Sequence, residues 1–251
     1  MNHFAIGFIA FVAIFGGALI GIFAARTLPE QHLSNESRNA ISVSAAIVGT
    51  LSALVIGLMI TTANSSFSAR SSEVTRIAVD IVRINRLMER YGPEAEDARV
   101  KLRNYANAKM QELFPVMGEP SQSTDATVRM MERTQESILL LVPTDPRQRW
   151  LRSQALTLSD EVLQARWLLA EQHANNIPMP FLTLLIFWLS LVLASFGLFA
   201  PRNATTITAL CLCSVAVAGG ILMILELDSP FSGLVHVSGE PMRQALAEIL
   251  R

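Results

Sequence analysis

Charge is missing from four long stretches of this 251-residue sequence. No Asp, Glu, Lys, Arg or His occurs in Phe4–Ala25, Asn39–Ala69, Ala174–Pro201 or Asn203–Leu225. A bilayer core about 30 Å thick needs about 20 apolar helical residues, and an ionised residue at its centre costs about 2.5–3.5 kcal/mol. Each stretch is long enough to cross the bilayer. The sequence therefore predicts an all-α, polytopic membrane protein with four transmembrane helices, embedded in a lipid bilayer.

Motifs of catalysis are absent as well. The sequence contains no Gly-rich phosphate loop, no Cys-x-x-Cys, no His-Glu-x-x-His and no Gly-x-Ser-x-Gly. Its two cysteines, Cys211 and Cys213, lie in the fourth apolar stretch and point about 200° apart on a helix, which makes a disulfide between them implausible. The net charge of −1 offers no basic field for nucleic acid. We therefore expect no enzyme, no cofactor and no nucleic-acid partner, and we assign no metal site with confidence.

The charge that is present gathers between the second and third apolar stretches. Residues 70–171 hold 15 Lys or Arg and 15 Asp or Glu, which is typical of a water-exposed helical bundle. Directly after the second stretch, apolar residues follow alternating steps of three and four: Val74, Ile77, Ile81, Ile84 and Met88. The second helix therefore continues out of the membrane as one long rod, and Tyr91-Gly92-Pro93 ends it. Three more amphipathic helical stretches follow: Glu94–Phe114, Asp125–Val142 and Pro146–Asn175.

These patterns divide the chain into four parts. They are 1–69, with transmembrane helices at about 4–25 and 40–66; 70–176, a helical domain; 177–226, with transmembrane helices at about 179–200 and 204–225; and 227–251, a segment with a short amphipathic helix. Arginines cluster on the side of the helical domain (Arg70, Arg76, Arg83, Arg86 and Arg90), whereas the other side has Arg26, Arg38 and Arg202. Because Lys and Arg favour the cytoplasmic side, we expect the helical domain, inserted between helices two and three, and both termini to be cytoplasmic.

The second apolar stretch carries small side chains every four residues: Gly49, Ala53, Gly57, Thr61 and Ser65. One interpretation is helix packing, because small residues let backbones approach closely. The other is that the helix repeats around a symmetry axis and one face lines a pore, where polar groups replace part of an ion's hydration shell and apolar residues gate by dewetting. The two interpretations are compatible. The candidate pore-lining residues are Gly49, Ala53, Ile56, Gly57, Ile60, Thr61 and Asn64.

Two groups of charges could also bear on function. Arg76, Asp80 and Arg83 follow the second apolar stretch, and they would either form charged rings in a vestibule or belong to a solvated helix face with i, i+3 pairs. Glu226 and Asp228 lie just past the fourth stretch. Two carboxylates could ligate a hard cation through oxygen, or they could stand at a solvated membrane edge.

Several motifs resemble those of the bestrophin-like family of bacterial membrane proteins. They are Leu28-Pro29-x-x-His32, the core Ala53-Leu54-Val55-Ile56-Gly57-Leu58-Met59-Ile60 with Ala63-x-x-Ser66-Phe67, Tyr91-Gly92-Pro93-Glu94-Ala95, Glu226-x-Asp228-x-Pro230-Phe231-x-Gly233, and Val237-Ser238 followed by Pro241 and Ala245-Leu246. Together these motifs span nearly the whole chain.

The resemblance implies kinship with bestrophins, which are pentameric ion channels with four spanning helices, cytosolic termini and a pore lined by the second helix. Animal bestrophins narrow that pore with aromatic side chains, whereas residues 40–66 contain no Phe, Tyr or Trp. The leading hypothesis is a homo-oligomeric channel for small inorganic ions in the bacterial inner membrane. The alternative is a non-conducting scaffold or sensor whose cytoplasmic bundle binds a protein, with the stripes Val74–Met88 and Leu151–Leu169 as docking surfaces.

Overall fold

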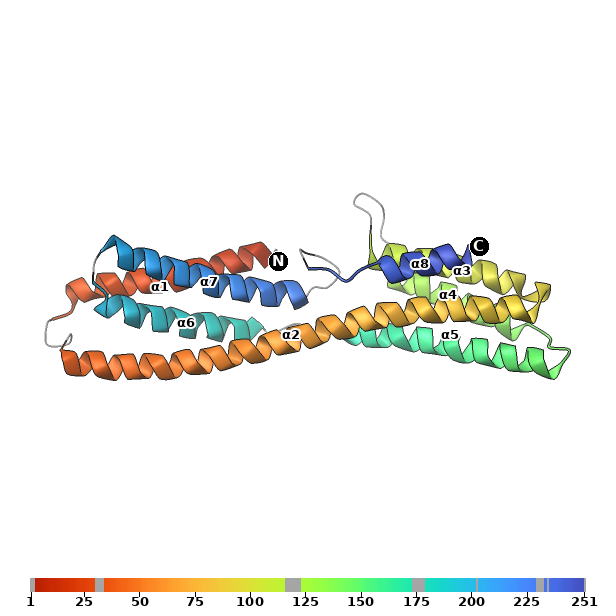
Figure 1. Cartoon of the computed structure of the whole chain (residues 1–251), viewed down its shortest axis with the longest axis horizontal. Coiled ribbons are helices and arrows are strands. Elements are labelled where there is room, and N and C mark those ends of the chain that lie inside the picture. Colours follow the sequence, from red (N-terminus) through yellow and green to blue (C-terminus); the bar gives the residue numbers. More distant parts are fainter. Residues whose placement is uncertain are drawn as a thin grey trace. The chain divides into compact units, whose positions relative to one another are not determined.

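The structure, a computed structural model, describes residues 3–29, 34–115, 123–172, 179–201, 203–228, 233 and 235–250, with the backbone alone for 166–172. Within these residues every regular element is helical, so the predicted all-α class is confirmed (Figure 1). The helices are α1 (His3–Thr27), α2 (Asn35–Tyr91), the short 3₁₀ helix η2 (Pro93–Ala95), α3 (Glu96–Leu113), α4 (Thr124–Leu139), α5 (Pro146–Gln172), α6 (Met179–Phe199), α7 (Ala204–Asp228) and α8 (Glu240–Ile249).

Side-chain caps and helix breakers explain several of these boundaries. Asp145 Oδ1 accepts a hydrogen bond from the backbone N–H of Gln148 at 2.6 Å, and Asn203 Oδ1 accepts one from Thr206 at 2.8 Å, so each side chain caps the helix that follows it. After the last residue of α2, Gly92 adopts a φ of 130°, a backbone conformation that favours glycine, and a proline follows it. The chain therefore cannot continue α2 beyond Tyr91.

Four helices are long and apolar enough to cross a membrane, as the charge-free stretches predict. The most apolar windows of α1, α2, α6 and α7 have mean hydropathies of 2.5, 2.3, 2.3 and 2.4. α2 contains 57 residues, far more than a span needs. Figure 1 shows it as one unbroken helix, so the predicted continuation of the second helix to Tyr91 is confirmed.

The chain forms two compact units. The first comprises Met1–Ser66 and Asn175–Val235, and contains α1, the first half of α2, α6 and α7. Its core is apolar and includes Ile14, Leu185 and Ile221, each almost fully buried.

Glycines bring α1 and α6 into backbone contact. A methyl group on Gly17 would lie 2.6 Å from the Ser190 carbonyl oxygen, and one on Gly21 would overlap the Ala194 carbonyl. On the opposite helix, a methyl group on Gly197 would overlap the Ala18 carbonyl. The two helices therefore pack closely because these positions have no side chain.

The second unit, Phe67–Ala174 with His236–Arg251, contains the second half of α2, η2, α3, α4, α5 and α8. Its core combines apolar residues of α2 (Ile77, Ile81, Ile84 and Met88) with Leu102 of α3, Met131 of α4 and Met242 of α8. The described members of both apolar stripes, Val74–Met88 on α2 and Leu151–Ala165 on α5, are buried inside this unit. The hypothesis that these stripes dock a partner protein is therefore wrong, because the bundle itself covers them. Leu169 lies outside the residues whose side chains are described.

Candidate functional site

One side of α2 packs against its own chain in the first unit. Ala45, Ser52 and Ala63 are buried, and Val48 and Met59 pack against the apolar core. These positions are three, four or seven residues apart, as expected for a single helix face. They fix the helix by one side only.

The rest of this half of α2 is uncovered. In its most apolar 18-residue window, 17% of the residues are buried, against 22% in α7 and 33% in α1 and in α6. A methyl group on Gly49 or Gly57 would meet nothing within 4 Å, in contrast to Gly17 or Gly21 on α1. Gly49 and Gly57 of the small-residue stripe are thus not packed against the described residues of the chain. An apolar helix left open on most of its circumference requires lipid or another subunit beside it.

The predicted pore-lining residues differ in how exposed they are. Ala53, Gly57, Ile60, Thr61 and Asn64 are exposed. Gly49 is half-buried, and Ile56 is half-buried and packs against the apolar core of the unit. At about 100° per residue, Ile56 therefore lies toward the packed side of α2, whereas Gly57, Thr61 and Asn64 lie away from it. Their assignment to a pore stays a prediction.

The exposed polar groups near the end of this stretch have a defined chemistry. Thr61 Oγ1 donates to the Gly57 carbonyl at 2.9 Å, and Thr62 Oγ1 donates to the Leu58 carbonyl at 3.0 Å. Because each hydroxyl hydrogen is directed to the helix, the oxygen lone pairs remain for an outside group. The exposed Asn64 amide adds both donors and an acceptor. This face can therefore replace water molecules around a small ion.

The charges predicted for a vestibule form an ion-pair cluster in the second unit. The Asp80 side chain is 5% exposed and lies 3.4 Å from Arg83 Nη1 and 3.9 Å from Arg76 Nε. Arg76 also reaches Glu161 of α5 at 3.6 Å. Burial raises the pKa of the Asp80 carboxyl and the Glu161 carboxylate raises it further, while Arg83 and Arg76 partly offset both effects. The arginines are about half exposed, so they rather than Asp80 meet the solvent.

Arg83 also belongs to a cluster of arginine side chains that the sequence did not predict to share one site. Arg83, Arg86 and Arg90 of α2 line a pocket of about 260 Å³ together with Trp150 and Gln154 of α5. Arg86 Nη2 donates to Glu248 Oε1 of α8 at 2.8 Å. Their spacing of three and four residues places them on one helix face.

The second predicted site lies at the end of α7. Glu226 is buried, and its Oε1 lies 3.4 Å from His3 Nδ1. Gly233 adopts a φ of 130° beside this carboxylate, and a methyl group there would overlap Glu226 Oε2. Among the described residues, no three His, Cys, Asp or Glu side chains gather where they could hold a metal ion. The cation site at Glu226 and Asp228 therefore stays a prediction, and it would have only these two carboxylates as protein ligands. His32, Pro230 and Phe231 lie outside the described residues.

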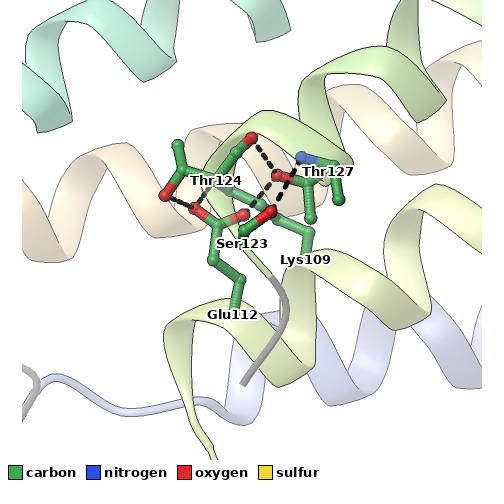
Figure 2. A network of polar contacts seen from close by, with 6 residues as sticks. Lys109, Glu112, Ser123, Thr124 and Thr127 are labelled. Carbon is green, nitrogen blue, oxygen red and sulfur yellow. Dashed lines mark hydrogen bonds and ion pairs between the residues drawn. The ribbon is translucent and has the colours of Figure 1, made fainter. Parts of the chain in front are cut away.

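A buried polar network in the second unit was not anticipated from the sequence (Figure 2). Lys109 Nζ pairs with Glu112 Oε1 at 2.9 Å, and both side chains are nearly buried. Thr124 and Thr127 of α4 donate their hydroxyls to the same carboxylate of α3. The i, i+3 spacing of Lys109 and Glu112 stands in the sequence, but nothing there reveals that the pair is buried. The network ties the end of α3 to the start of α4.

Four spanning helices, an unusually long second helix and a helical bundle between the second and third spans define a class of helical membrane protein. The model of the bestrophin-like domain matches residues 12–242, and the chain therefore belongs to the bestrophin-like family. The family resembles ion channels rather than enzymes. A search of curated proteins gave no match.

Solved structures agree with this family. One point variant of a bacterial bestrophin homologue from Klebsiella pneumoniae has a TM-score of 0.70 at 14% identity, covering 96% of this chain and 97% of that chain. A further structure of the homologue, phased with zinc, has a TM-score of 0.67 at 15% identity, with 97% of each chain covered. A variant described only as a membrane protein gives 0.68 at 14% identity, covering 96% of this chain and 97% of its own. At these identities the likeness establishes the fold.

Proposed function

We propose that this chain is a homo-oligomeric ion channel that conducts small inorganic ions through a pore lined by α2. One observation carries the proposal: α2 is apolar, yet its own chain covers it on one side only. Membership of a family that resembles ion channels supports the same kind of function. By resemblance to bestrophins, the assembly is a pentamer in the bacterial inner membrane, with the bundle and both termini in the cytoplasm.

The uncovered face of α2 suits a position near a symmetry axis. Gly49 and Gly57 let neighbouring helices approach closely, and a cyclic assembly repeats the same face around one centre. Ile60 would narrow the pore by dewetting, while Thr61 and Asn64 would contact partly dehydrated ions. The charge-free spans contain no acidic or basic group for a proton relay, which favours a passive pore over coupled transport. Arg76 and Arg83 would stand at the cytoplasmic mouth.

Reconstitution tests the proposal. The purified full chain in liposomes is expected to conduct ions, and Ile60→Ala is expected to change the unitary conductance at least twofold by widening an apolar constriction. Leu58→Ala is the matched control, because Leu58 is 68% exposed and lies on another face of the same helix turn. Bilayers that stay silent at all tested voltages and salts, or equal effects of the two variants, would contradict the proposal.

A second candidate function is a non-conducting scaffold that binds a protein through the bundle. It is favoured by exposed apolar side chains: Leu140 and Val142 in the α4–α5 connection are 74% and 82% exposed, and Trp150 near the start of α5 is 58% exposed. A sealed central axis in the assembled particle, together with loss of a co-purifying protein in Leu140→Ser/Val142→Ser, would favour this function over conduction.

A further inference from the structure

A cavity of about 440 Å³ lies within the first unit, between α1, α2 and α6. Small side chains account for much of its wall: Gly21 and Ala24 of α1, Ser44 and Ala45 of α2, and Ala194 and Ser195 of α6. The contact of Gly21 with the Ala194 carbonyl draws α1 and α6 together. The short side chains of α2 do not fill the space that remains. The volume falls in the range of about 300–1,000 Å³ that is usual for ligand pockets.

Water is a poor occupant of this cavity. Among the described residues of its wall, the side-chain hydroxyls are those of Ser44 and Ser195. Ser44 Oγ donates to the Ala40 carbonyl at 2.9 Å, and Ser195 Oγ donates to the Leu191 carbonyl at 2.8 Å. Neither hydroxyl hydrogen is left for a guest molecule. A buried water needs two to four polar partners, and apolar cavities stay dry.

The rim of the cavity is part of the surface that the unit presents to the membrane. Ile20 and Leu191 line the cavity and are still 69% and 50% exposed. Lipids are one kind of molecule that can lie beside such a surface, because their tails are as apolar as these side chains. An unfilled space forfeits dispersion contacts on its whole lining. A flexible acyl chain removes that loss without leaving a polar group unsatisfied.

The position of the cavity along the helices fits an acyl chain of one leaflet. Ala24 lies one turn before the end of α1, Ile41 near the start of α2, and Leu198 next to the last residue of α6. From Leu191 to Leu198 the wall extends about 10 Å at 1.5 Å per residue. We propose that one acyl chain of a membrane phospholipid occupies this cavity, held between α2 and the α1–α6 pair. This proposal depends on the membrane spans and not on conduction.

Photolabelling of the full chain tests the site. The probe is a phosphatidylethanolamine with a mid-chain diazirine on one acyl chain, diluted into phosphatidylethanolamine and phosphatidylglycerol liposomes. After irradiation, peptide mapping is expected to place adducts on residues 41–48 and 191–198 at least fivefold above those on Phe8 and Phe187. These two residues are 67% and 58% exposed and do not line the cavity, so they report ordinary contact with lipid.

Filled cavities provide the decisive comparison. Ala45→Phe is expected to reduce adducts in the cavity wall at least fivefold, and Ala24→Leu is a second filling variant in case the first does not fold. Ala40→Phe is the matched control, because Ala40 is exposed on the same helix and does not line the cavity. Equal labelling of all exposed positions, or labelling that survives in folded Ala45→Phe and Ala24→Leu proteins, would overturn the proposal. So would cross-links from Ser44→Cys to a second copy without lipid adducts, since a neighbouring subunit would then fill the space.

Discussion

At the scale of single residues, the surroundings of Asp80 disfavour the ionised form of its carboxyl group. Its side chain is almost fully buried in the bundle, and the facing groups are Arg76 and Arg83 on α2 and Glu161 on α5. Burial and Glu161 raise the pKa of Asp80 from its ordinary value of 3.8 by more than the two half-exposed arginines lower it. The folded state therefore binds the Asp80 proton more tightly than the unfolded state does.

This difference predicts a pH dependence with a definite sign. Between about pH 3.8 and the raised pKa the folded state holds more protons, so the contribution of Asp80 to stability falls as the pH rises through this window. Relative to Asp80→Asn, the wild-type protein is expected to gain thermal stability as the pH is lowered from 7 to 4. Melting temperatures of both proteins in detergent, measured across this range, check the expectation. A constant difference between them would contradict it.

Residues in the candidate pore illustrate what single positions could and could not reveal. The four-residue spacing from Gly49 to Thr61 indicated a stripe of small side chains on α2, and the structure leaves open space beside Gly49 and Gly57 of this stripe. The same spacing could not reveal that Ile56 packs against the core, because its neighbours come from distant parts of the chain. The charge-free sequence around Gly17 and Gly21 matches a small-x-x-x-small pattern, and this signal would have identified a packing face on α1 but not α6 as its partner.

At the scale of helices, the α1–α6 contact depends on Gly21. A methyl group there overlaps the Ala194 carbonyl, so Gly21→Ala forces the two helices apart. Overpacking of this kind costs about 1–3 kcal/mol. Gly16→Ala is the matched control, because a methyl group on Gly16 meets nothing within 4 Å and alanine favours a helix over glycine. Thermal unfolding in detergent should show a loss of stability for Gly21→Ala only; equal melting temperatures would refute the close approach.

The junction of α3 and α4 depends on the Lys109–Glu112 pair. Lys109→Met leaves the Glu112 carboxylate buried without its cation, a change that costs about 3–5 kcal/mol. Adding Glu112→Gln removes the isolated charge, and the amide oxygen of the glutamine still accepts a hydrogen bond from one of the two threonines, Thr124 or Thr127, so the double variant is expected to recover at least half of the loss. Equilibrium denaturation of the three variants in a double-mutant cycle measures the coupling. Additive effects would mean that the pair does not act as a unit.

The helices themselves were largely predictable, and their partners were not. Charge-free stretches located the four spans, and the seam from Val74 to Met88 predicted the length of α2. The amphipathic stripes identified surfaces to be covered but not what covers them. In the structure, the apolar stripes of α2 and α5 are buried in one core together with residues of α3, α4 and α8. Tertiary packing of this kind depends on contacts between residues far apart in sequence, which periodicity does not encode.

At the scale of the whole molecule, the open side of α2 predicts self-association. An apolar helix with this little covering is expected to be completed by other copies of the chain. Native mass spectrometry of the solubilised protein should give a particle of five copies of the 27.5 kDa chain, the number implied by resemblance to bestrophins. A single copy at all detergent concentrations would contradict self-association. Another number of copies would retain the assembly and correct its symmetry.

Because α2 runs from Asn35 to Tyr91 without a break, its residues belong to both compact units. A continuous hydrogen-bonded helix resists twisting, since each turn is tied to the next by bonds four residues apart. Rotation of α2 about its axis at Ile84 is therefore expected to rotate Thr61 as well, because both residues belong to the same helix. Under the proposed function, a ligand or partner that turns the second-unit half of α2 would also turn its pore-lining side chains, because the same helix carries both.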